Sequence, residues 1–234
     1  MPRLTGRLAL VTGASRGVGA AVAKRFAAEG AHVVLLARTQ GGLEEVDDAV
    51  RQAGGQTTLV PLDLRDVDKI DPMAAALAQR FGRLDVLASC AGVLGALSPL
   101  GHVEPKTWDE VFAVNVTANY RLIRALDPLL RRSPSGRAIF ATCAAGRASL
   151  PYWGAYAASK AALETLVRTY AGEVANTTNL RVNLADPGPV RTKLRAQAFP
   201  GEDRAALKAP EDVTGIFVEL AAAECRRHGE IVAA

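Results

Sequence analysis

Short apolar runs alternate along the chain with longer segments of helical period. Runs of four to six apolar residues are typical of buried strands, whereas side chains that recur every three or four positions line one face of a helix. The strand candidates are residues 8–11, 33–37, 58–62, 86–89, 138–142 and 181–185, and Ile231 and Val232 could begin a last one.

Helical periodicity fills the intervals between these runs. Val18, Val22 and Phe26 would line one face of the first helix. A later helix would carry Leu163, Leu166, Val167, Tyr170 and Val174 on one face. This alternation predicts an α/β fold in which helices cover both faces of a mainly parallel, doubly wound sheet, in three layers. Residues 1–234 would form a single domain, because that length suits one core.

Ligands of such folds bind beyond the carboxyl ends of the strands, where the strand order reverses. The least regular stretch, residues 195–209, contains Pro200, Gly201 and several charges. We predict that it forms a loop over the site.

Composition narrows the class of protein. Hydrophobic residues make up 49% of the chain and charged residues 22%, which is ordinary for a globular protein. We expect a cytoplasmic protein without a membrane span, since no apolar run is long enough and no leader opens the chain. The three cysteines lack metal-ligand spacing. The net charge of +4 comes from dispersed residues, which argues against nucleic-acid binding.

A glycine-rich segment follows the first strand and precedes the first helix. Glycines there allow a tight turn and a close approach of the backbone to a pyrophosphate, and the helix amino end adds unpaired N–H groups. An ordinary strand-to-helix turn is the alternative, but the position favours phosphate binding. The candidate cofactor-binding residues of this segment are Gly13, Ser15, Arg16, Gly17, Val18 and Gly19.

Tyr156 and Lys160 stand four positions apart in a predicted helix, so their side chains would share one face. A nearby ammonium group stabilises a phenolate and lowers the pKa of the tyrosine. Such a hydroxyl can exchange a proton near neutral pH, as carbonyl–alcohol interconversion requires. The spacing alone also fits a packed tyrosine beside a solvated lysine.

Together, the Gly-x-x-x-Gly-x-Gly spacing and the Tyr-x-x-x-Lys pair resemble the short-chain dehydrogenase/reductase family, whose fold is Rossmann-like. The resemblance covers practically the whole chain, because further family motifs follow in order. The matching positions, which the resemblance assigns to cofactor binding together with Tyr156 and Lys160, are Asp63, Leu64, Ala91, Gly92, Pro187, Gly188, Val190 and Thr192.

The resemblance implies that Tyr156 is the general acid/base and that Lys160 lowers its pKa and binds the nicotinamide ribose. Asn115 would hold a water in a proton relay through Lys160, which we favour over the alternative that it satisfies backbone groups as a structural residue. The substrate would be a small carbonyl compound or secondary alcohol. Relatives generally form homodimers and often homotetramers, and a homodimer is the expectation for this chain.

Arg38 ends the second strand, where NAD-preferring enzymes usually carry an acidic residue for the ribose 2′-hydroxyl. An arginine can instead pair with a 2′-phosphate, and Arg16 could add a second charge. The two residues favour NADP(H) over NAD(H).

Cys143 stands thirteen residues before the tyrosine, where the family has a catalytic serine. A thiol is a weaker hydrogen-bond donor than a hydroxyl. Cys143 could line a working pocket, which we favour, mark a nearly inactive cofactor-binding protein, or act as a redox-sensitive thiol. Thr142 would replace the serine imperfectly, because adjacent strand residues point to opposite faces.

Cys90 is the second position at which the chain differs from the family motif, since the family usually has asparagine there. We expect it to alter local hydrogen bonding rather than chemistry. The sequence therefore predicts an NADP(H)-dependent oxidoreductase, with a catalytically weak regulatory or scaffold protein as the alternative.

Overall fold

The computed structural model describes residues 2–234 and contains one parallel sheet within them. The sheet has seven strands in the order β3-β2-β1-β4-β5-β6-β7. Their bounds are β1 Leu8–Thr12, β2 His32–Ala37, β3 Gln56–Pro61, β4 Val86–Ser89, β5 Arg137–Ala141, β6 Arg181–Asp186 and β7 Ile231–Ala233. All predicted strands, including the last, are confirmed with ends that differ by at most two residues.

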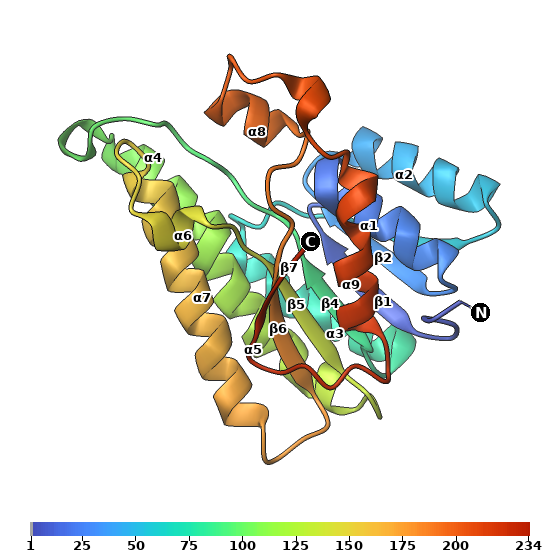
Figure 1. Ribbon diagram of the computed structural model, residues 1–234. Helices are drawn as coiled ribbons and strands as arrows, with labels where there is room; N and C mark the ends of the chain where they lie inside the picture. Colours follow the sequence, from blue (N-terminus) through green and yellow to red (C-terminus); the bar gives the residue numbers. More distant parts are fainter. Residues whose placement is uncertain (1) are drawn as a thin grey trace.

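Helices cover both faces of the sheet (Figure 1). Their bounds are α1 Gly17–Ala28, α2 Gln40–Gln52, α3 Ile70–Phe81, α4 Pro105–Phe112, α5 Ala118–Arg131, α6 Ala145–Ala148, α7 Gly154–Val174, α8 Lys193–Ala198 and α9 Thr214–Ala221. Apolar side chains of α3, α5 and α7 form the core on one face, and those of α1, α2 and α9 form the core on the other. The predicted three-layer, Rossmann-like α/β fold is confirmed.

The strand order reverses at β1, which pairs with β2 on one side and β4 on the other. Chain segments that leave the carboxyl ends of these two strands diverge to opposite faces of the sheet, which opens a crevice between them. The glycine-rich segment follows β1, and Cys90 follows β4. Both therefore lie at this crevice.

The segment over the site differs from the prediction at its start. Instead of a loop throughout residues 195–209, helix α8 begins at Lys193 and ends at Ala198. The hydroxyl of Thr192 accepts a hydrogen bond from the Arg195 N–H (3.1 Å) and so caps the helix. Figure 1 shows α8 above the carboxyl ends of the strands.

Asn115 lies in a π-helical turn, Ala113–Thr117, that joins α4 to α5. Such turns insert one residue into a helix and re-aim its side chains, often at functional sites. Within residues 2–234, no helix combines the length and the apolar character that crossing a bilayer requires.

Candidate active site

A cavity of about 1120 Å³ runs along the carboxyl ends of the strands, beneath α8. It joins the glycine-rich segment at one end to the Tyr156 phenol at the other. Of the residues singled out in the sequence, it is lined by Gly13, Ser15, Arg16, Gly17, Val18, Gly19, Arg38, Asp63, Leu64, Ala91, Gly92, Cys143, Tyr156, Lys160, Pro187, Gly188, Val190 and Thr192. Asn115 lies outside this lining, behind Gly92.

The glycine-rich segment forms a cradle that side chains would fill. Gly13 has φ +66°, and a Cβ there would lie 2.9 Å from the Ala91 Cα. A Cβ on Gly19 would collide with the Gly13 carbonyl oxygen. The backbone without side chains therefore lies at the amino end of α1. A pyrophosphate bound there would be stabilised by unpaired backbone N–H groups and by the helix dipole. These residues fit a dinucleotide cofactor.

The cradle is covered from above by the segment that follows β6. The Thr192 methyl group lies 3.4 Å from the position of a Cβ on Gly17. Val190 is buried and pairs with Lys208 in a short bridge, which fixes this covering segment. The Pro187–Thr192 region and the glycine-rich segment thus face each other across the cavity.

Arg38 and Asp63 mark the end of the cavity remote from Tyr156. Arg65 pairs with the Asp63 carboxylate (2.6 Å), and this hydrogen bond, with a smaller contribution from Arg38, lowers the pKa of Asp63. Arg38 is exposed and has no ion-pair partner among residues 2–234. Its guanidinium is therefore available to an anionic ligand.

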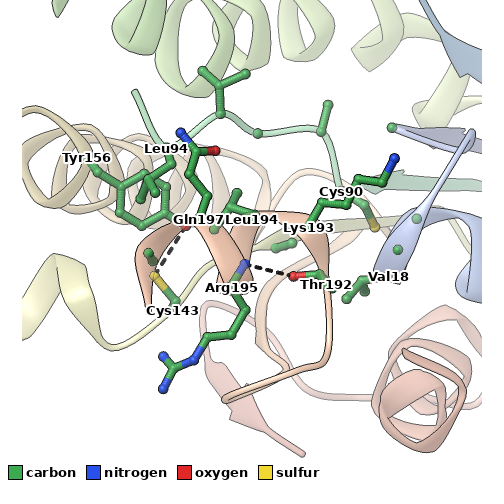
Figure 2. Close-up of a pocket in the computed structure, with 18 of the residues that line it drawn as sticks. Val18, Cys90, Leu94, Cys143, Tyr156, Thr192, Lys193, Leu194, Arg195 and Gln197 are labelled. Carbon is green, nitrogen blue, oxygen red and sulfur yellow. Dashed lines mark hydrogen bonds between the residues drawn. The ribbon is translucent and has the colours of Figure 1, made fainter. Parts of the chain in front are cut away.

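Tyr156 lies at the other end and is 7% exposed. The Cys143 thiol donates to its phenol oxygen over 3.6 Å, as Figure 2 shows. Burial raises the pKa of Tyr156 well above its usual value, and Cys143 and Asp186 raise it further. The lowering expected from Lys160 is therefore not seen, because burial is the largest cause of the shift.

Lys160 shares the buried face of α7 with Tyr156. Its ammonium group donates to the Ala141 carbonyl oxygen (3.0 Å) and lies 5.7 Å from the centroid of the Tyr156 ring. Burial lowers the pKa of Lys160, against the opposing effect of Cys143 and other neighbours. The alternative of a solvated surface lysine is excluded by this burial.

Asn115 makes three hydrogen bonds with its side-chain amide. It accepts from the Val93 N–H (2.9 Å) and donates to the Val93 carbonyl (2.9 Å) and the Ser159 hydroxyl (3.0 Å). Both of its N–H donors are thus used by protein groups. This geometry favours the alternative that Asn115 satisfies backbone groups and holds the chain after β4 in place.

Cys90 follows β4, where main-chain N–H groups are held by a side chain of β1. The Thr12 hydroxyl accepts from the N–H groups of Cys90 and Ala91, both at 3.1 Å, and so links β1 to the chain after β4. Ser89 extends this link by donating to Asn119 (2.7 Å). Burial raises the pKa of the Cys90 thiol to about 12, so this thiol is unreactive at neutral pH.

An ionic network around the carboxylates of Glu164 and Asp186 was not predicted from the sequence. Arg147 pairs with Glu164 and, at 2.7 Å, with Asp186, and the Thr142 hydroxyl donates to Glu164 (2.7 Å). The Asp186 carboxylate also accepts from the Gly188 N–H (3.0 Å). Glu164 follows Lys160 by four positions, so helical spacing could have placed it on the same face. The network links α6, α7 and the chain after β6. Because the Thr142 hydroxyl donates to Glu164, it is not bonded to Tyr156.

The crevice at the strand-order reversal, the glycine cradle and the buried tyrosine–lysine pair fit a nucleotide-binding α/β enzyme. Comparisons with known proteins identify the family. The short chain dehydrogenase family model matches residues 7–203. The chain belongs to the short-chain dehydrogenase/reductase family, which the sequence resemblance predicted, and its relatives are named oxidoreductases and dehydrogenases.

Similar proteins come from several bacteria. The chain is 38% identical over 227 residues to the uncharacterized oxidoreductase YciK of Escherichia coli K12, covering 96% of this chain and 89% of the relative. A structure named as a short chain dehydrogenase from Pseudomonas syringae has a TM-score of 0.96 at 39% identity, covering 100% and 96% of the two chains. A Shigella flexneri short chain dehydrogenase complexed with NADP has a TM-score of 0.95 at 36% identity, covering 99% and 98%.

Proposed function

We propose that this chain is an NADP(H)-dependent oxidoreductase that transfers a hydride between the nicotinamide and a carbonyl or secondary alcohol substrate, with Tyr156 as the general acid/base. The observation that carries this proposal is the buried Tyr156 phenol, which lies at one end of a cavity whose other end is a glycine cradle. Turnover of ketones and aldehydes with NADPH tests it. The reverse oxidation would use the same residues in their other protonation states.

Cofactor binding would use the residues that line the cavity away from the substrate end. Gly13, Gly17 and Gly19 would hold the pyrophosphate, and Asp63 and Leu64 the adenine. The remaining proposed contacts are made by Ser15, Arg16, Val18, Arg38, Ala91, Gly92, Tyr156, Lys160, Pro187, Gly188, Val190 and Thr192. When bound, NADPH supplies the hydride that the carbonyl carbon accepts.

Tyr156 would donate its phenolic proton to the substrate oxygen as the alkoxide develops. A protonated phenol is the state that carbonyl reduction requires, and the reverse oxidation starts from the phenolate. Lys160 would bind the nicotinamide ribose and stabilise the phenolate left after proton transfer. Asn115 would act as a positioning residue, through its bonds to Val93.

Cys143 would take the position of a catalytic serine and offer the substrate oxygen only a weak S–H donor. Its 3.6 Å contact with the Tyr156 oxygen supports this placement and favours a second candidate function. In that candidate, the chain binds NADPH but turns over little substrate, as a regulatory or scaffold protein. Both functions require cofactor binding, so only turnover separates them.

NADP(H) is the proposed cofactor, since Arg38 faces the cavity without an ion-pair partner among residues 2–234 and a similar structure from Shigella flexneri holds NADP. We expect Arg38→Asp to lower the ratio of kcat/KM for NADPH to that for NADH by about 10- to 100-fold, because a charge-assisted bond to the 2′-phosphate is lost and a repulsion replaces it. Steady-state kinetics with both cofactors measure this ratio.

Arg168→Asp is the matched control for this substitution, because Arg168 is exposed on α7 and absent from the cavity lining. It should leave the cofactor ratio unchanged. An unchanged ratio in Arg38→Asp would contradict the assignment of Arg38.

Three further properties belong to the same proposal. Residues 1–234 would form one cofactor-binding domain, the protein would be cytoplasmic, and two chains would associate as a homodimer, with a homotetramer as the alternative. Closed symmetric assemblies of this kind are the commonest among oligomers.

A further inference from the structure

The space beside the Tyr156 phenol is walled by apolar side chains from separate parts of the chain. These are Leu94 after β4, Ala145 on α6, Trp153 before α7, and Leu194 and Ala198 on α8, and we call them the substrate pocket. They cluster with Tyr156 and Cys143. Figure 2 shows Leu94 and Leu194 close to the Tyr156 ring.

Charged side chains on the same segments are directed elsewhere. The Arg195 guanidinium pairs with Glu202 (2.7 Å) and lies 3.8 Å from the centroid of the Phe199 ring. In Figure 2 it extends away from Tyr156. Arg147 on α6 pairs with two carboxylates, those of Glu164 and Asp186. The side chains that form the substrate pocket carry no charge themselves. Lys160 and Lys193 also line the cavity, and the Lys160 ammonium group already donates to the Ala141 carbonyl oxygen (3.0 Å).

Aromatic rings give the pocket a flat wall. Trp153 packs edge-on against Tyr156, with ring centroids 5.9 Å apart and an interplanar angle of 63°. The Phe199 ring also packs against Trp153, with ring centroids 5.5 Å apart and an interplanar angle of 40°. A wall held in this way presents a rigid hydrocarbon surface, which stabilises a bound ring through burial and aromatic contact.

Helix α8 closes the pocket from above. The Gln197 side-chain amide donates to the Gly95 carbonyl oxygen (3.2 Å), which links α8 to the chain after β4. Leu194 and Ala198 then face Tyr156 from the covering helix. A charged group placed against these apolar side chains would lose part of its hydration without compensation.

We propose that this pocket selects uncharged carbonyl compounds that carry an apolar ring next to the carbonyl group. The inference rests on the proposed function and specifies its substrate class. It predicts that, of two ketones with the same ring and the same carbonyl group, the uncharged ketone has the higher kcat/KM.

The test compares acetophenone with para-acetylbenzoate, two ketones that differ by one carboxylate on the ring. We expect kcat/KM with NADPH to be about 100-fold or more higher for acetophenone, because the apolar side chains of the pocket do not compensate the lost hydration of the carboxylate. Equal values, or a higher value for the carboxylate, would overturn the inference and leave the proposed function standing. Turnover of neither ketone, nor of any other carbonyl compound, by protein that binds NADPH would contradict the proposed function and this inference together.

A charge placed in the pocket should reverse the preference. Leu194→Lys puts an ammonium group on the wall that faces Tyr156, so kcat/KM should fall for acetophenone and rise at least 10-fold for para-acetylbenzoate. Leu100→Lys is the matched control, since Leu100 is 66% exposed and outside the cavity lining, and it should leave both values unchanged. An unchanged preference in a folded Leu194→Lys protein would contradict the assigned wall.

Discussion

Tyr156→Phe should reduce kcat for NADPH-dependent carbonyl reduction by about 10³-fold or more while leaving NADPH binding unchanged. The substitution removes one oxygen from a buried ring and keeps the hydrocarbon that packs against Trp153. A positioned general acid accelerates a reaction by about 10²- to 10⁴-fold. Among residues 2–234, no second hydroxyl group contacts the Tyr156 oxygen. Steady-state turnover and titration of NADPH fluorescence measure the two effects separately.

Tyr170→Phe is the matched control, because Tyr170 lies on the same helix and its hydroxyl donates to Asp127 (2.7 Å) far along α7 from Tyr156. Loss of this hydrogen bond should lower the free energy of unfolding by about 1 kcal/mol without changing kcat. Retention of most of the activity in Tyr156→Phe would show that another group supplies the proton.

Cys143→Ser should raise kcat by about 10- to 100-fold. The serine hydroxyl is a stronger donor than the thiol that now contacts the Tyr156 oxygen at 3.6 Å. Removal of one such donor from an oxyanion site costs about 10²- to 10³-fold in well-studied enzymes, so restoring it should recover much of that factor. The KM for NADPH should change little, because the substitution acts on the developing charge of the substrate oxygen.

Cys225→Ser makes the same chemical change outside the cavity and should leave kcat unchanged. A loss of turnover in a folded Cys143→Ser protein would mean that the thiol has a role of its own. A gain would favour an enzyme with a weakened site over a regulatory or scaffold protein.

The fold could be predicted because its signals are local. Each strand is a short apolar run, and its burial on both faces follows from helices on each side of the sheet. Helix α8 was missed because it is six residues long and starts with a capping bond from Thr192, while nearby Pro200 and Gly201 indicate a loop. A short helix of this kind depends on its cap and on contacts with the rest of the molecule, which sequence periodicity does not report.

The positions of the site residues could be predicted, but their electrostatic setting could not. Family motifs bring Tyr156, Lys160 and Cys143 to one end of the cavity. The raised pKa of Tyr156 depends on burial and on Asp186, which reaches the site from a strand thirty residues later in the sequence. The hydrogen bonds of Asn115 likewise depend on the path of the chain after β4. Such effects arise from tertiary packing.

Isotope transfer to a ketone measures the proposed reaction most directly. The purified protein is incubated with NADPH that carries deuterium at the transferable nicotinamide position and with a panel of ketones and aldehydes that includes acetophenone. We predict an alcohol with deuterium on its carbinol carbon, formed in an amount equal to the NADPH oxidised. Absence of deuterated alcohol from every carbonyl compound, in protein that still binds NADPH, would contradict the assignment of this chain as an NADPH-dependent carbonyl reductase.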